Sequence, residues 1–234
     1  MAKQNVWLSV SDLMTGLMII FLFIAISYIK QVQDHVSDIS DYVEVKQNLH
    51  DKLVREFKGD TARWVMSIGK DLSMKFNNSK VQFAQGSWDI SPNFKNTLDE
   101  FLPRYFNILL NDTLRYHITE VRIEGHTDNV PYPRLNSDPY LANVILSQRR
   151  SLAVLEYFRN MNYYKDLSDD KKEMLEFWFT ANGLSYGKAL DVSGNYFFFQ
   201  KDKIDLDRSR RVEFRIITDS EKLLENFVSK VNKE

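Results

Sequence analysis

The most apolar part of the chain is a continuous run near its amino terminus, residues 6–29. About 20 apolar residues at roughly 1.5 Å each cross the hydrocarbon of a bilayer as one helix, so this run is long enough to span. Trp7 and Tyr28 stand near its two ends, where amphipathic rings favour the membrane interface. A secretory signal peptide would have a shorter apolar core and a small-residue cleavage site. The pattern therefore predicts one transmembrane helix within residues 1–30.

Beyond this run, apolar positions recur at intervals of three, four or multiples of these, which predicts an amphipathic helix that continues outward. These positions are Val32, Val36, Ile39, Val43, Leu49, Leu53 and Phe57. The narrow stripe suits a two-stranded coiled coil or a plug lying on the membrane, and equally a solvated stalk packed on the next domain. Gly59 and Asp60 break the pattern. We expect residues 31–65 to be a linker and residues 66–234 to be the folded domain.

The rest of the chain alternates strand-like and helix-like patterns. Short alternating or apolar runs predict strands at 81–84, 121–124, 177–181 and 212–217. Apolar residues at helical spacing predict helices at 93–110, 143–160 and 223–231. Strands that alternate with helices favour a sheet with helices packed on one face, so the expected fold class is α/β (α+β).

Composition narrows the possible functions. The chain carries 31 Lys plus Arg against 32 Asp plus Glu, and this near-zero net charge argues against a nucleic-acid partner. It has no cysteine, which excludes a disulfide scaffold and a thiolate metal site. The four histidines show no zinc-binding spacing, and the sequence has no nucleophile elbow or phosphate loop. We therefore expect neither an enzyme nor a bound cofactor or metal.

Asp12 is the only formally charged side chain inside the apolar run. A carboxylate in the bilayer costs roughly 2.5 to 3.5 kcal/mol on insertion scales, so it usually faces protein or water and has a function. Residues three and four apart share a helix face, which groups Ser9, Asp12, Thr15 and Gly16 on one small polar side. Asp12 can carry an ion, H⁺ or Na⁺, with Thr15 assisting. The alternative is that Asp12 lies among the lipid headgroups, since it is only about 9 Å from the start of the run.

A second pattern in the anchor helix consists of Trp7, Ser11-Asp12-Leu13-Met14-Thr15, Leu17-Met18 and Phe21-Leu22-Phe23. This pattern resembles the transmembrane segment of MotB-type stator subunits of bacterial rotary motors. Within that family it looks closer to the B subunits of Zorya anti-phage systems than to flagellar stators, because Ser11 and Leu13 replace the usual Ala and Phe. The resemblance implies that Asp12 carries the ion and that two copies stand inside a ring of MotA-like polytopic membrane subunits.

Four segments follow one another in the rest of the chain: Phe83 with Gly86-Ser87 and Ile90, residues 121–128, Asn143 with Leu146-Ser147 and Arg149-Arg150, and Arg208 with residues 210–214. In this order they resemble an OmpA-like peptidoglycan-binding domain, and the resemblance covers residues from about 80 to 218. The resemblance implies a βαβαββ fold in which Asp128 and Arg150 bind the ligand. It also implies that Thr127, Asn143 and Leu146 shape the pocket.

The chemistry of these residues agrees with a cell-wall ligand. The diaminopimelate of a stem peptide carries an amine and carboxylates, so its site needs an anion and a planar donor fork, which Asp128 and Arg150 can supply. Arg149 adjoins Arg150 and is a further candidate. The alternative is that Arg149 and Arg150 form a charged helix face while Arg210 and Arg211 pair with Asp128 or Glu124 in a structural network. Exposed pairs of that kind contribute only about 0 to 1 kcal/mol.

These observations lead to one hypothesis, an ion-driven stator subunit of the Zorya type, homodimeric and anchored to peptidoglycan. It would be a single-pass protein of the bacterial inner membrane, with a cytoplasmic amino terminus and a periplasmic carboxyl-terminal domain, because long polar domains translocate largely regardless of charge. A flagellar stator is the alternative with the same mechanism. A passive tether between membrane and wall would not need Asp12. Force transduction by an ExbD-like protein shares a membrane acid but does not explain the wall-binding motifs.

Overall fold

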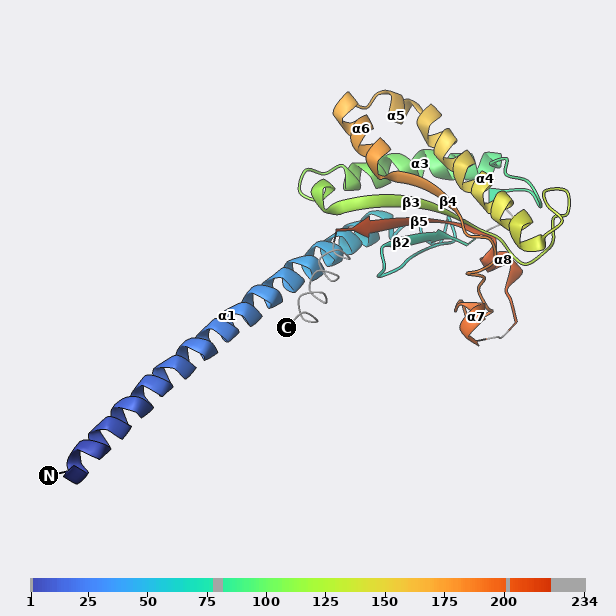
Figure 1. Cartoon of the computed structure of the whole chain (residues 1–234). Helices are drawn as coiled ribbons and strands as arrows, with labels where there is room; N and C mark the ends of the chain where they lie inside the picture. The colour runs from blue at the N-terminus through green and yellow to red at the C-terminus, as the bar shows by residue number, and fades with distance from the viewer. Residues whose placement is uncertain (1, 78–81, 201–202, 220–234) are drawn as a thin grey trace. The chain divides into compact units, whose positions relative to one another are not determined.

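The computed structural model describes residues 2–77, 82–200 and 203–219. Contacts divide the chain into two units, and the larger one is Val45–Asp219. One helix, α1 (Ala2–Phe57), makes up the described part of the first unit and continues into the second (Figure 1). Its sequence contains no proline and a single glycine, so nothing in its backbone chemistry interrupts the helix.

The apolar part of α1 is long and hydrophobic enough to cross a membrane. The stretch Val10–Gln33 meets this condition by length and composition, and none of it is buried within the protein. Side chains such as Phe21 and Phe23 are more than half exposed there, as expected where lipid or a partner helix covers the apolar surface. The predicted single amino-terminal apolar helix is confirmed. Because the stretch begins at Val10, Asp12 lies in its first turn.

The last turns of α1 belong to the folded domain. Leu49, Leu53 and Phe57 are fully buried and form part of the hydrophobic core. The compact unit therefore begins at Val45, well before the expected boundary at residue 66. For residues 45–57 this supports the alternative of a stalk that packs on the domain, because the apolar stripe is covered by the domain itself.

The second unit is built on a five-stranded sheet with the order β1-β2-β5-β3-β4. The strands are β1 (Met66–Ile68), β2 (Ser73–Phe76), β3 (Ile118–His126), β4 (Phe179–Gly183) and β5 (Arg211–Thr218). Strands β3 and β4 run parallel, and every other neighbouring pair is antiparallel. The long strands β3 and β5 form the centre of the sheet, where residues 121–125 of β3 and 212–215 of β5 pair with a strand on each side.

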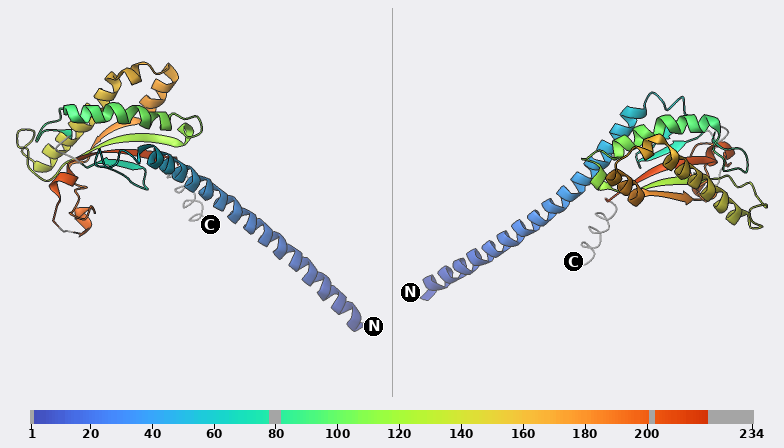
Figure 2. Two further views of the ribbon diagram at one scale, coloured as in Figure 1. Left: turned by 180° about the vertical axis from the view of Figure 1, so that it is seen from behind. Right: turned by 90° about the horizontal axis from the view of Figure 1, so that it is seen from above.

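Helices cover one face of this sheet, as the sequence predicted (Figures 1 and 2). On that face are α3 (Pro92–Leu109), α4 (Pro139–Asn160) and α6 (Asp169–Trp178). The shorter helices are η1 (Arg115–His117), α5 (Asn162–Lys165), α7 (Phe197–Gln200) and α8 (Leu206–Ser209). The segment that contains α7 and α8 projects on the other side of the sheet.

The two long helices of the domain begin with the same local device. Ser91 and Asp138 are the N-cap residues of α3 and α4, and their side-chain oxygens accept hydrogen bonds from free backbone N–H groups of the first turn. A proline follows each cap, Pro92 and Pro139, where its fixed φ favours the helix and its missing N–H costs nothing. Both start points are therefore encoded locally.

Alternation along β5 separates the two faces of the sheet. Phe214 points into the core, where its ring centroid lies 5.1 Å from that of Phe101 on α3 and 6.0 Å from that of Phe76 on β2. Its neighbours Glu213 and Arg215 point to the opposite face, because successive side chains of a strand alternate. One face is thus an aromatic core and the other carries buried charges.

The predicted α/β class is confirmed, with one correction to the strands. Segment 81–84 is not a strand, because in its described part Phe83 makes only an isolated bridge to Ile90. The strand that precedes α3 in the sheet is instead β2, a short segment with a lysine and a serine whose pattern was too weak to predict. With β2 in first place the predicted βαβαββ order holds, and β1 adds a hairpin at the edge.

The other predicted strands correspond to β3, β4 and β5, and the helices predicted at 93–110 and 143–160 correspond to α3 and α4. Helix α4 starts four residues earlier, at Pro139, because Asp138 caps it there. The helix predicted at 223–231 lies outside the described residues.

Candidate functional site

Asp128 lies in the turn that follows β3, and its side chain is fully buried. One carboxylate oxygen accepts a hydrogen bond from the backbone N–H of Val130 at 3.1 Å. The other accepts one from Nη1 of Arg210 at 2.9 Å. The structural alternative for Arg210, a pair with Asp128, is therefore confirmed, whereas Arg211 pairs with Glu213. A ligand amine would have to share or replace the Arg210 contact.

Arg150 lies on α4 and is only 4% exposed. Its Nε donates to the carbonyl oxygen of Ser87 at 2.9 Å and its Nη2 to that of Ala84 at 3.4 Å, while the guanidinium carbon stands 5.1 Å from the centre of the Phe83 ring. These carbonyls take two of the five guanidinium N–H donors. Burial lowers the pKa of Arg150 to about 10, although the nearby Asp128 carboxylate favours its charge. The side chain is therefore a buried cation, and binding of an anionic ligand would stabilise its charge.

A cavity of about 290 Å³ lies beside these arginines. It is lined by Gln82, Phe83, Ala84, Gln85, Arg150, Arg210 and Arg211. Guanidinium groups bind carboxylates through parallel N–H donors, and a partly enclosed site strengthens that interaction. The lining therefore fits a ligand that carries at least one carboxylate. Asp128 does not line the cavity itself but is hydrogen-bonded to Arg210, which does.

Thr127, Asn143 and Leu146, which the resemblance expects to shape the pocket, are not among the residues that line the cavity. The amide nitrogen of Asn143 donates to the carbonyl oxygens of Val130 and Pro139, both at 3.0 Å, and so joins the turn after β3 to the start of α4. The backbone N–H of Thr127 donates to the carbonyl of Ser185 at 3.0 Å. Leu146 is fully buried. The side chain of Asn143 therefore positions the turn that carries Asp128.

Arg149 points elsewhere. Its side chain is exposed, and its guanidinium carbon stands 4.3 Å from the centre of the Trp88 ring. A cation over an indole ring at an exposed site is worth about 0.5 to 1 kcal/mol. Arg149 and Arg150 thus leave the same helix toward different surroundings, and only Arg150 lines the cavity.

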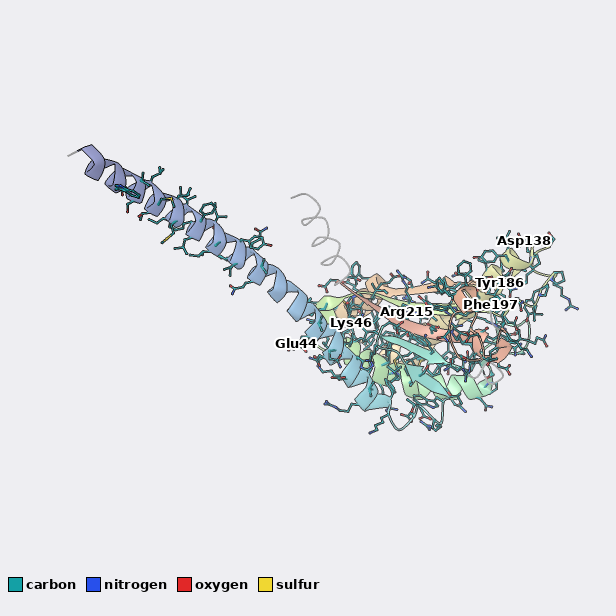
Figure 3. All side chains as sticks on the ribbon, turned by 90° about the horizontal axis from the view of Figure 1, so that it is seen from below. Glu44, Lys46, Asp138, Tyr186, Phe197 and Arg215 are labelled. Carbon is teal, nitrogen blue, oxygen red and sulfur yellow. The ribbon has the colours of Figure 1, made fainter. Side chains whose placement is uncertain are left out.

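One further residue at the site, Tyr132, was not singled out from the sequence. Tyr132 is half-buried, and burial together with the Asp128 carboxylate raises the pKa of its hydroxyl. Its ring packs on Gly86, whose φ is +70° and where an added Cβ would stand 3.1 Å from the ring. The glycine of the Gly86-Ser87 pair is therefore required by conformation and by space. Figure 3 labels Asp138 and Tyr186, on the start of α4 and the loop after β4, at this end of the domain.

The second candidate site lies on α1 and consists of Asp12 and Thr15. The Thr15 hydroxyl donates to the carbonyl oxygen of Ser11 at 2.8 Å, within the helix. Its proton is therefore engaged and its lone pairs remain free to accept. Thr15 lies three residues after Asp12, which puts both on one side of the helix.

Comparisons with known proteins identify the relatives of this chain. No protein-family model matches the sequence. The chain is 37% identical to the Zorya protein ZorB of Escherichia coli strain Crooks over 222 residues, which cover 92% of this chain and 88% of that protein. One amino-terminal helix of membrane-spanning length before an α/β domain fits the class of single-pass membrane proteins. Within it, the chain belongs to the ZorB family of Zorya proteins, and the predicted relationship to Zorya B subunits is confirmed.

Solved structures were compared as well. The OmpA-like domain of FopA1 from Francisella tularensis matches with a TM-score of 0.38 and 18% identity, covering 65% of this chain and 80% of that one. The periplasmic domain of Helicobacter pylori MotB matches with a TM-score of 0.39 and 13% identity, covering 69% of this chain and 89% of that one. At these TM-scores the family assignment rests on the ZorB relative alone.

Proposed function

We propose that this chain is the ion-driven stator subunit of a Zorya anti-phage system, anchored to peptidoglycan and working with a MotA-like membrane partner. The observation that carries the proposal is Asp12, which is the only charged residue between positions 10 and 29 of the membrane-length stretch of a ZorB-family chain. A lone acid in such a stretch is expensive and therefore marks an ion pathway. The proposal assigns the chain no catalytic step.

In this mechanism Asp12 alternately binds and releases H⁺ or Na⁺. Thr15 offers lone pairs, because its own proton is bonded to the Ser11 carbonyl. These can accept a hydrogen bond from a protonated Asp12 or coordinate a sodium ion. A membrane potential supplies about 2.3 kcal/mol per charge per 100 mV, enough to bias a step of the surrounding ring. Two copies of the chain stand inside that ring, with amino termini in the cytoplasm and the domains in the periplasm.

The anchor is the cavity beside Arg150 and Arg210. A stem peptide carries an amine and carboxylates, so its carboxylate would bind the guanidinium groups while its amine approaches Asp128. The stem peptide would thus offer its amine to Asp128 and its carboxylate to Arg210, so that each member of the pair has a partner of opposite charge. A subunit without this anchor would turn with its load, and ion flow would then do no mechanical work.

A phage challenge with the variant Asp12→Asn tests the motor. Asn keeps the size of the side chain but cannot exchange an ion, so we expect protection against phage to be lost at normal membrane levels of the protein. The matched control is Asp34→Asn, because Asp34 directly follows the membrane-length stretch in the sequence of the same helix. This variant should retain protection. Full protection by Asp12→Asn would reject the motor and leave the passive tether.

A further inference from the structure

The face of the sheet opposite the helices contains two acidic residues directly across from each other. Glu124 of β3 and Glu213 of β5 are ladder partners in the antiparallel pair. They are 3% and 0% exposed, respectively. Like charges directly opposite in a sheet are destabilising, and burial makes them more so. Such a pair persists only where cations compensate it.

Two arginines provide part of that compensation. Arg211 donates from Nε to Glu213 at 2.6 Å. Arg215 bridges the carboxylates, with its Nε 3.2 Å from Glu124 and its Nη2 3.0 Å from Glu213. An ionised carboxylate has about four lone-pair positions, so these bonds leave each acid with accepting capacity. Asp71 bonds to Arg215 at 2.6 Å and adds a third negative charge to the group.

His126 stands between the two acids and has no hydrogen bond of its own. The ring is 1% exposed, and neither of its nitrogens has a hydrogen-bond partner among the described residues. Its Nε2 lies 3.7 Å from Glu124 and 3.6 Å from Glu213, which is too far for a hydrogen bond. Buried nitrogens without partners call for an explanation such as an ion.

We propose that Glu124, His126 and Glu213 form a binding site for a divalent cation, for which Zn²⁺ is the best match. Their three ligand atoms all lie within 4.8 Å of one another, and two of the separations are 3.6 and 3.7 Å. Zinc bonds of about 2.0 to 2.2 Å at tetrahedral angles put ligand atoms roughly 3.3 to 3.6 Å apart, so small side-chain shifts complete the site. Calcium and magnesium prefer six or more oxygen ligands, which this donor set does not offer.

The surroundings fit a zinc site. Arg211 and Arg215 bond to the carboxylates and fix their orientation, the role that outer partners play around bound metals. Lys75 lies opposite Glu213 in the β2–β5 ladder, so the charges of Asp71 and the two glutamates equal those of Lys75 and the two arginines, and the cluster is neutral before a cation binds. Three protein ligands leave a fourth position for water. The ion would join β3 to β5 directly before the turn that carries Asp128.

Metal binding by the purified full-length chain in detergent tests this site. The protein is stripped with a chelator and dialysed against micromolar ZnCl₂, and bound zinc is measured by mass spectrometry. We expect about one Zn²⁺ per chain and a rise in the unfolding temperature, because a ligand of the native state stabilises it. Binding far below one equivalent in the wild-type chain would overturn the proposal, whatever the variants do.

His126→Gln is the decisive variant, because the amide can bond to the carboxylates but is a poor zinc ligand. We expect its zinc affinity to fall by at least about tenfold, which is the smallest loss usually seen even for an outer partner. His117→Gln is the matched control, since His117 lies in η1 outside the cluster, and it should bind like the wild type. Circular dichroism checks that both are folded. Equal binding by a folded His126→Gln would also overturn the site.

Discussion

Arg210 donates a hydrogen bond of 2.9 Å to the fully buried carboxylate of Asp128, 82 positions away in the chain. The acid that the motif marks for ligand binding is therefore neutralised by a side chain of the same domain. Arg210 also contacts Asp207 on α8, so the pair connects the turn after β3 to the segment before β5. A ligand of Asp128 would therefore have to compete with a contact inside the domain.

Removing Arg210 should destabilise the domain. Arg210→Ala leaves Asp128 buried without its cation, and breaking a buried pair costs about 3 to 5 kcal/mol. The free energy of unfolding from urea titration measures the loss. The double variant Arg210→Ala with Asp128→Asn should recover part of it, because the unpaired charge is gone. Strict additivity of the two single changes would mean that the pair is not coupled.

Arg150 should matter more to peptidoglycan binding than Arg149. Arg150→Ala removes a cavity guanidinium, and we expect binding in a sedimentation assay with purified sacculi to fall by about tenfold or more, since hydrogen bonds to charged groups contribute about 1.5 to 3 kcal/mol. Arg150→Lys keeps the charge but loses the donor fork and should recover only part of the binding. Arg149→Ala, outside the cavity, is the control. A larger loss of binding for Arg149→Ala than for Arg150→Ala would indicate that peptidoglycan binds at the surface around Trp88 rather than in the cavity.

Gly86→Ala should strain the loop that Arg150 holds. The φ of +70° disfavours a side chain by about 1 to 2 kcal/mol, and the new Cβ would stand 3.1 Å from the Tyr132 ring. We expect a lower unfolding temperature and weaker sacculus binding. Gly59→Ala serves as the control, because nothing lies within 4 Å of a Cβ there. Equal unfolding temperatures for the two variants would contradict this account.

Stability should fall in acid partly through Asp71. Burial raises its pKa, but hydrogen bonds from Ser73 and Arg215 outweigh that and lower the pKa to about 2. Because the folded value lies below the ordinary value of about 3.9, this contribution is complete above pH 4 and is lost as the pH falls toward 2. The side chain is 49% exposed, so the contribution is at most about 1 kcal/mol.

The variant Asp71→Asn should therefore lower stability at pH 7 slightly and flatten its decline between about pH 4 and pH 2. Urea titrations at a series of pH values measure both effects. Asp112→Asn, whose carboxylate is 87% exposed, is the control and should follow the wild type. A decline in Asp71→Asn as steep as in the wild type would show that other carboxylates account for it.

Much of the fold could be predicted because its signals are local. The caps Ser91 and Asp138 lie beside the helices that they start, and the alternation of β3 and β5 is visible within a few residues. Strands β1 and β2 could not be predicted, since short strands with polar residues depend on the neighbours that they pair with. Segment 81–84 has a strand-like composition, but its described residues do not pair with any strand of the sheet.

The site residues also fall into those that could be predicted from the sequence and those that could not. Asp128 and Arg150 could be named from motif residues, because the motif lies within two short segments. The sequence left open whether Arg210 pairs with Asp128 and whether residues 49–57 pack on the domain, because both depend on contacts between distant parts of the chain. His126 is a motif residue, but only the β3–β5 register brings it between Glu124 and Glu213.

By itself the sequence determined the apolar helix with its single acid, the class of the domain and the family. Hydropathy and periodicity act over neighbouring residues, so the chain order contains them. Only the tertiary structure decided which charges meet, because β-sheet register and helix packing join residues that are far apart in the chain. In a buried site those pairings determine which side chains remain free for a ligand and which serve to hold the fold.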